Sequence, residues 1–171
     1  MSPLDRHQEQ FKRVQRWYER FKSINNGIIH NKASEFYEDE MYAFFMNCYH
    51  LKDWIINDPA TVLVANKVEK YINNNLDLKL CADLCNSLKH LCSGKNIRPT
   101  RSKEDPNIGK KSGKLNIGAG PIIFEMKIII NTLSGPRDAF DIATKCMEAW
   151  DKFYSDNKLN VTGSFDSSII R

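Results

Sequence analysis

The chain of 171 residues has the length of one domain, and its 42% hydrophobic and 27% charged residues are close to the averages for globular proteins. A chain of this size needs neither a disulfide nor a metal to stay folded, and a formal net charge of +4 permits binding to phosphate without indicating it. The N-terminus lacks the apolar segment of a signal peptide, and no apolar run is as long as a membrane span. We therefore expect a cytoplasmic protein with a single domain over residues 1–171.

The odd number of cysteines argues against a secreted disulfide framework, which usually pairs an even number in a shorter chain. The five are Cys48, Cys81, Cys85, Cys92 and Cys146. No two of them have the CxxC spacing of a zinc knuckle. We expect reduced and mostly buried thiols.

Four helices are predicted in the first half of the chain. Apolar residues at helical spacing, bounded by capping and helix-breaking residues, place them at about 4–25, 34–56, 60–72 and 77–91. The second helix is apolar nearly all round, which is typical of a central bundle helix or of a helix buried in a dimer interface. An exposed apolar stripe of this size usually marks an interface, so we expect a homodimer.

The second half of the chain has a different character. Residues 93–114 are rich in lysine, arginine, glycine and proline and are expected to form a basic loop. We predict strands over 115–133, a C-terminal helix over 136–155 and a frayed tail over 156–171. The predicted fold is mainly α: an antiparallel helical bundle over 4–92 that carries a small antiparallel β-sheet or hairpin and a C-terminal helix.

Asp83, Asn86 and His90 share one side of the fourth predicted helix. Offsets of three, four and seven residues return to the same face because each residue turns the helix by roughly 100°. A histidine there can act as general acid or base near neutral pH, and the amide can orient a ribose hydroxyl or a phosphate. The alternative is a solvated polar face without any chemistry.

His50 and Asp53 lie one turn apart on the second predicted helix, where polar groups among apolar neighbours need partners. In one interpretation this turn faces the fourth helix, and all five polar side chains converge in one cluster. In the others it is a helix end that reaches water, or an Asp–Lys pair. The HxxD and DxxNxxxH spacings are weak as ligand patterns, so we expect no metal and no other cofactor.

The stretch CNSLKH from Cys85 to His90 resembles the Arg-Asn-x-x-x-His motif of HEPN (higher eukaryotes and prokaryotes nucleotide-binding) helical bundles. Asn86 and His90 match the asparagine and the histidine of that motif, and Cys85 stands in the place of its arginine. The resemblance covers at most residues 4–92. It implies a dimeric, metal-independent endoribonuclease in which His90 is the general acid or base and Asn86 the orienting group.

The basic loop is interpreted either as a solvated, mobile loop or as a contact for phosphates, in which each phosphate that a cation neutralises releases counterions. The residues assigned to this role are Lys95, Arg98, Arg101, Lys110, Lys111 and Lys114. With His50, Asp53 and Asp83 in supporting roles, the sequence predicts a HEPN-like module that binds RNA or a nucleotide, or a degenerate ribonuclease. The alternative is a non-catalytic protein-interaction module, which the missing arginine favours.

Overall fold

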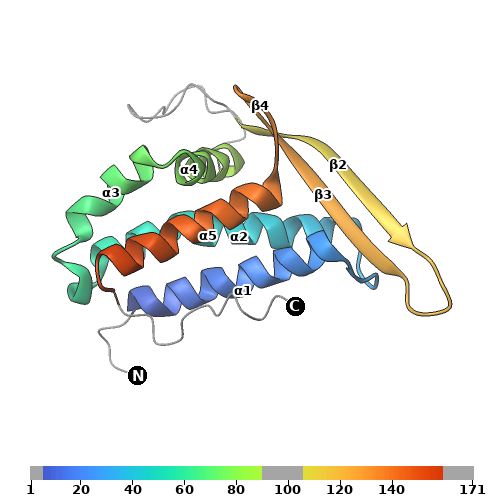
Figure 1. Ribbon diagram of the computed structural model, residues 1–171, viewed down its shortest axis with the longest axis horizontal. Helices are drawn as coiled ribbons and strands as arrows, with labels where there is room; N and C mark the ends of the chain where they lie inside the picture. Colours follow the sequence, from blue (N-terminus) through green and yellow to red (C-terminus); the bar gives the residue numbers. More distant parts are fainter. Residues whose placement is uncertain (1–5, 90–105, 160–171) are drawn as a thin grey trace.

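The computed structural model describes residues 6–89 and 106–159 (Figure 1). Its elements in chain order are α1 (Arg6–Asn26), β1 (Ile28–Ile29), α2 (Ser34–Asn57), the 3-10 helix η1 (Pro59–Thr61), α3 (Ala65–Asn74), α4 (Leu76–Lys89), β2 (Asn107–Asn116), β3 (Ile123–Thr132), β4 (Gly135–Asp138) and α5 (Ala139–Asp156). The fold is mainly helical with a small antiparallel sheet and a C-terminal helix, which confirms the predicted fold class. No helix in this part of the chain combines the length and the apolar character that a membrane span requires.

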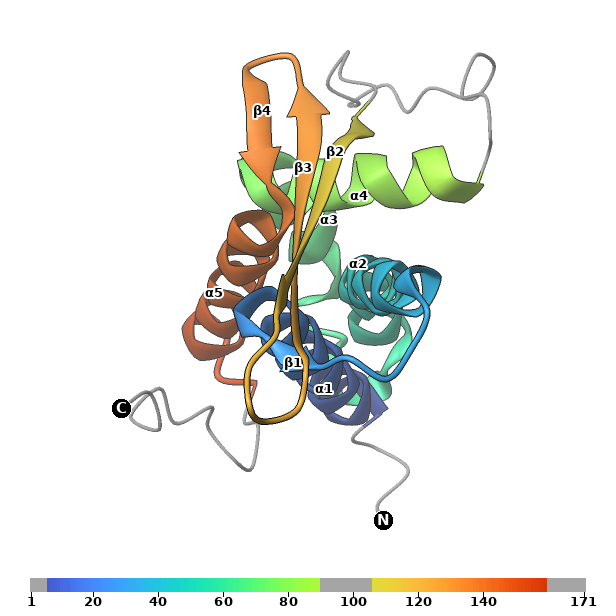
Figure 2. The same ribbon diagram turned by 90° about the vertical axis from the view of Figure 1, so that its right-hand side faces the viewer.

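The helix α2 lies at the centre of the bundle and contacts α1, α3, α4 and α5 (Figures 1 and 2). Its buried apolar residues are Tyr37, Met41, Phe44, Phe45, Cys48, Tyr49, Leu51 and Ile55. The helices α1, α2 and α5 run alongside one another, and α4 crosses them on the side of α2 away from α1. Four neighbouring helices thus bury most of the apolar residues of α2, whereas Phe36 and Met46 remain 42% and 46% exposed.

The strand β3 is the centre of the sheet. It pairs with β2 along one edge, and on its other edge with β1 at one end and β4 at the other. Its even-numbered residues Phe124, Met126, Ile128 and Ile130 are buried, and the odd-numbered ones between them are not. This alternation packs one face of the sheet onto the helices, and the β2–β3 hairpin extends past them (Figure 1).

The predicted boundaries of the basic loop and of the last helix are wrong. Residues 107–114, expected in the loop, belong to β2, and residues 135–138 form β4 instead of the first turn of a helix. Asp138 is the N-cap of α5, because its Oδ1 accepts hydrogen bonds from the backbone N–H groups of Phe140 (2.7 Å) and Asp141 (3.2 Å). The pairing of β4 with β3 holds 135–138 extended up to that cap.

The third predicted helix is also displaced. Residues 59–61 form η1, and regular α-helix begins only at Ala65 and continues to Asn74. Asp58 caps η1 through a 2.9 Å bond from the N–H of Ala60 to its Oδ1, with Pro59 at the first position, as the sequence indicated. The helices α1, α2 and α4 begin and end within about two residues of their predicted limits.

Candidate functional site

One of the two predicted catalytic residues, Asn86, lies near the C-terminal end of α4. The start of this helix is held by Asn75, whose Oδ1 accepts from the N–H groups of Asp77 (3.1 Å) and Leu78 (2.9 Å). Asn86 is half-buried, whereas His90 lies outside the described residues. The structure therefore places Asn86, and the catalytic roles of Asn86 and His90 both remain predictions.

The polar side of α4 is not a solvated face along its whole length. Asp83 is buried at 2% exposure, within a run from Leu80 to Cys85 that is entirely buried. Cys85, which stands at the position of the motif arginine, is also buried at 7%. A side chain at this position points into the core, so it is poorly placed to touch a substrate.

His50 and Asp53 form a pair near the C-terminal end of α2. The distance from His50 Nδ1 to Asp53 Oδ2 is 3.2 Å, and both side chains are about half exposed. Asp53 Oδ1 also lies 3.3 Å from the ammonium of Lys52, which in turn contacts Glu69 at 2.8 Å. Both alternatives suggested by the sequence, a turn that reaches water and an Asp–Lys pair, are thus present.

Asp53 of this pair lies beside the start of α1. Asp53 lines a shallow pocket of about 260 Å³ together with Arg6, Trp54, Asn57 and Asp58. Among the described residues, neither His50 nor Asp53 bonds to α4, which lies on the opposite side of α2. The described members of the predicted polar cluster are therefore divided between a solvent-exposed pair on α2 and two residues of α4, the buried Asp83 and the half-buried Asn86.

A second Asp–His pair, which the sequence did not indicate, is buried beside this pocket. Asp58 Oδ2 accepts from the backbone N–H of His7 and lies 2.9 Å from its Nδ1. Burial alone would raise the pKa of the Asp58 carboxyl, but the N–H groups of His7 and Ala60 and the His7 ring hold that pKa below its usual range. The two residues are 51 positions apart, so no local pattern could have paired them.

The buried pair resembles half of a catalytic triad but is poorly placed for catalysis. In a triad the carboxylate orients the imidazole, and the far ring nitrogen faces the substrate. His7 Nε2 is enclosed without a hydrogen-bond partner in the described part of the protein. The carbonyl of His7 accepts from Tyr154 Oη at 3.1 Å, so the pair joins the start of α1 to the ends of α2 and α5. Its geometry indicates a structural role.

The predicted phosphate contacts are also divided. Lys95, Arg98 and Arg101 lie outside the described residues, whereas Lys110, Lys111 and Lys114 are exposed on β2. Lys111 forms an ion pair with Glu38 at the start of α2, and this carboxylate raises the pKa of the lysine ammonium.

Lys110 and Lys114 have no ion-pair partner within residues 6–89 and 106–159. Lys114 lies opposite Glu125 in the β2–β3 register, but Glu125 Oε1 instead accepts from Asn116 Nδ2 at 3.0 Å. Lys110 lies at the irregularity between Ile108 and Lys111, where β2 has an extra residue against β3. The projecting hairpin therefore carries two unneutralised ammonium groups.

Two of the glycines that suggested a loop are required by close packing within the hairpin. A Cβ on Gly113 would lie 2.6 Å from the ring of Phe124, and one on Gly109 would lie 2.4 Å from Asn131 Oδ1. These positions accept no larger side chain unless a neighbour moves. The composition that indicated a loop therefore fits a strand whose neighbours approach the backbone closely.

Comparison of the chain with models of protein families, with curated proteins and with solved structures finds no match.

Proposed function

We propose that the protein is a HEPN-like helical module that binds RNA or a nucleotide through its phosphates, with the β2–β3 hairpin as one contact surface. The observation that carries the proposal is the pair of exposed lysines, Lys110 and Lys114, which lack a carboxylate partner among the described residues. Ammonium groups on a projecting strand reach a polyanion without first breaking an ion pair. The resemblance of the Asn86–His90 stretch to the HEPN motif also supports binding of RNA or a nucleotide.

The basic hairpin is tested by reversing its charge. Binding of a fluorescein-labelled single-stranded RNA is followed by anisotropy at several salt concentrations, for the wild type and for Lys110→Glu/Lys114→Glu. If each lysine neutralises one phosphate, the slope of log K against log salt becomes shallower by about 1.4. Binding should weaken most at low salt, where counterion release contributes most.

Two lysines of α5 provide a control with the same change in net charge. Lys145 and Lys152 are exposed and pair with Asp141 and Asp156 one turn away. Lys145→Glu/Lys152→Glu should weaken binding much less than the hairpin variant. An equal effect of both variants would mean that only net charge matters, and undetectable binding of the wild type at low salt would overturn the proposal.

Ribonuclease activity is a separate part of the proposal. If the module cleaves RNA, cleavage should continue in EDTA, because the HEPN-like chemistry uses side chains and no metal. His90→Ala should then lower the rate by about a hundredfold or more. The burial of Cys85 at the arginine position favours a module that binds without cleaving. RNA left intact by the wild type, with binding retained, is the result we expect.

The second candidate is a protein-interaction module that forms a homodimer, and exposed apolar residues on the same hairpin favour it. Leu115, Ile117 and Ile122 are 50%, 76% and 40% exposed around the β2–β3 turn, and β2 has no second neighbour among the described strands. An exposed edge strand with apolar side chains is a template for pairing with another chain. Light scattering at micromolar concentration should show a dimer that Leu115→Lys/Ile117→Lys converts to a monomer. A monomeric wild type would contradict this candidate.

A further inference from the structure

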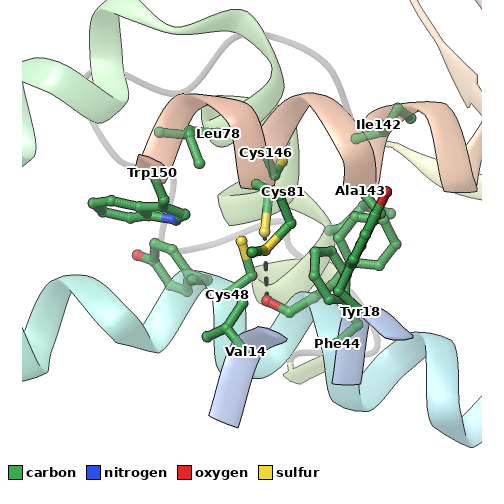
Figure 3. Packing of buried hydrophobic residues seen from close by; sticks show 14 of the residues in the cluster. Val14, Tyr18, Phe44, Cys48, Leu78, Cys81, Ile142, Ala143, Cys146 and Trp150 are labelled. Carbon is green, nitrogen blue, oxygen red and sulfur yellow. Dashed lines mark hydrogen bonds between the residues drawn. The ribbon is translucent and has the colours of Figure 1, made fainter. Parts of the chain in front are cut away.

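Three cysteine thiols meet in the core of the bundle, one from each of three helices. Cys48 of α2, Cys81 of α4 and Cys146 of α5 place their sulfur atoms within 4.8 Å of one another (Figure 3). The three residues are 0%, 1% and 0% exposed, and none of them forms a disulfide. The sequence predicted buried thiols but gave no reason to bring these three together.

The surroundings of the three thiols are apolar, with a few polar groups directed at the sulfurs. Cys81 Sγ donates to the carbonyl of Phe45 at 3.4 Å, and Cys146 Sγ donates to the carbonyl of Asp77 at 3.3 Å. The indole Nε1–H of Trp150 is buried and forms no hydrogen bond of normal geometry in the described part of the chain. Figure 3 shows the Trp150 ring beside Cys48.

The thiols differ in how readily they lose a proton. Burial raises the pKa of the Cys81 and Cys146 thiols well above the usual value. Burial also opposes ionisation of Cys48, but the neighbouring thiols of Cys146 and Cys81 and the Trp150 indole bring the pKa of Cys48 below its usual value.

We propose that Cys48, Cys81 and Cys146 form a binding site for one monovalent copper ion. At a metal–sulfur distance of about 2.3 Å, three sulfurs in a plane around one ion lie about 4 Å apart, so the observed spacing suits such an ion. Thiolates are soft ligands and select soft cations such as Cu(I). This site is independent of the proposed RNA binding.

The number of ligands distinguishes copper from zinc. Structural zinc sites are almost always tetrahedral, whereas Cu(I) is stable with two or three sulfur ligands. Among the described residues, no other cysteine, histidine or carboxylate places a ligand atom within 4.8 Å of all three sulfurs. Binding of Cu⁺ with release of two protons leaves two thiolates and one thiol around the ion. The site then carries one net negative charge, which the Trp150 N–H can stabilise by donating a hydrogen bond to Cys48.

The test is a competition for Cu(I) under anaerobic and reducing conditions. The protein carries Cys92→Ser, which removes the fifth thiol, and is titrated with Cu(I) against a chelator that absorbs when it holds copper. We expect one copper per chain, a thiolate-to-copper charge-transfer band in the ultraviolet and an increase in the melting temperature of the protein. Zn(II) should give a weaker increase.

Single variants identify the ligands. Cys48→Ser, Cys81→Ser and Cys146→Ser should each weaken copper binding by more than the roughly tenfold to hundredfold that loss of an outer partner costs. Cys85→Ser is the matched control, because Cys85 is buried on the same helix and beside Cys81 but lies outside the three-sulfur cluster, so it tests a neighbouring thiol that is not a ligand. Circular dichroism checks folding, and alanine replaces serine wherever a serine variant unfolds.

Three results would overturn the proposal. A reduced wild type that takes no copper from the chelator would show that the thiols only pack. Equal loss of binding in Cys85→Ser would show that copper binds elsewhere, and Zn(II) binding as tight as Cu(I) binding would contradict a three-sulfur site.

Discussion

The buried Asp58–His7 pair should be a principal stabilising contact between α1 and the end of α2, and Asp58→Asn tests this. The Asp58 carboxylate is fully buried and accepts three bonds of 2.9 Å, from the N–H and Nδ1 of His7 and from the N–H of Ala60. An amide of the same shape keeps one acceptor oxygen and turns its NH₂ group toward at least one of these donors. Each bond to a charged group contributes about 1.5–3 kcal/mol, and a buried donor left unpaired costs about 1–3 kcal/mol. We expect Asp58→Asn to lower the free energy of unfolding by about 3 kcal/mol.

The protein supplies its own control in the exposed pair. Asp53 and His50 form an aspartate–histidine pair like that of Asp58 and His7, but both lie on α2 and both side chains are about half exposed. Exposed ion pairs contribute about 0–1 kcal/mol, so Asp53→Asn should change stability by about 0.5 kcal/mol or less. Urea unfolding followed by circular dichroism measures both variants. Equal and small effects of Asp58→Asn and Asp53→Asn would refute the stabilising role of the buried pair.

The same pair predicts the pH dependence. The pKa of Asp58 is lower in the folded protein than in the unfolded chain, so its contribution is fully present above the unfolded value of about 3.9. That contribution is lost as the pH falls through the depressed pKa of the folded state. The stability difference between wild type and Asp58→Asn should therefore be largest near neutral pH and should narrow below about pH 4. A difference that stays constant down to pH 2 would contradict the charge-based explanation.

Two further predictions concern the sheet. Gly113→Ala should destabilise the protein by about 1–3 kcal/mol, because the new methyl group meets the ring of Phe124. Gly118→Ala should have almost no effect, because no atom lies within 4 Å of the position of its Cβ. Urea unfolding of the two variants compares them. Arg137→Met should lower the melting temperature, because the 2.6 Å ion pair of Arg137 with Asp77 is largely buried and the substitution leaves the Asp77 carboxylate without this partner. Differential scanning calorimetry measures the shift. An unchanged melting temperature would show that water replaces the arginine.

The local pattern of the sequence was enough to predict α1, α2, α4 and the strand β3. Helical and strand periodicities depend on neighbours within a few residues, and these segments carry a clear period. The Asp58–Pro59 start of η1 was predicted for the same reason, because a cap is a contact between residues two or three positions apart. The HEPN-like motif remains a prediction, since His90 lies outside the described residues.

Only the tertiary structure showed that 107–114 is a strand. Lysine and glycine are poor strand formers, and β2 is extended because ladder bonds to β3 hold it there, with an irregularity between Ile108 and Lys111. A sequence pattern does not reveal that the ring of Phe124 lies against Gly113. Residues 107–114 are therefore a strand because of their pairing with β3 and not because of their own composition.

The same limit applies to the polar and thiol residues. The sequence shows which of them lie on one helix, and only the tertiary structure shows which of them meet across helices. Periodicity placed His50 and Asp53 on one helix face, but the packing of α2 placed Asp53 beside the start of α1. The convergence of Cys48 with Cys146 and the contact of His7 with Asp58 join positions far apart in the chain. Such contacts depend on how whole helices cross, and a crossing is set by the summed packing of many side chains. A sequence therefore specifies which faces its helices have, whereas the packed core decides which of those faces meet.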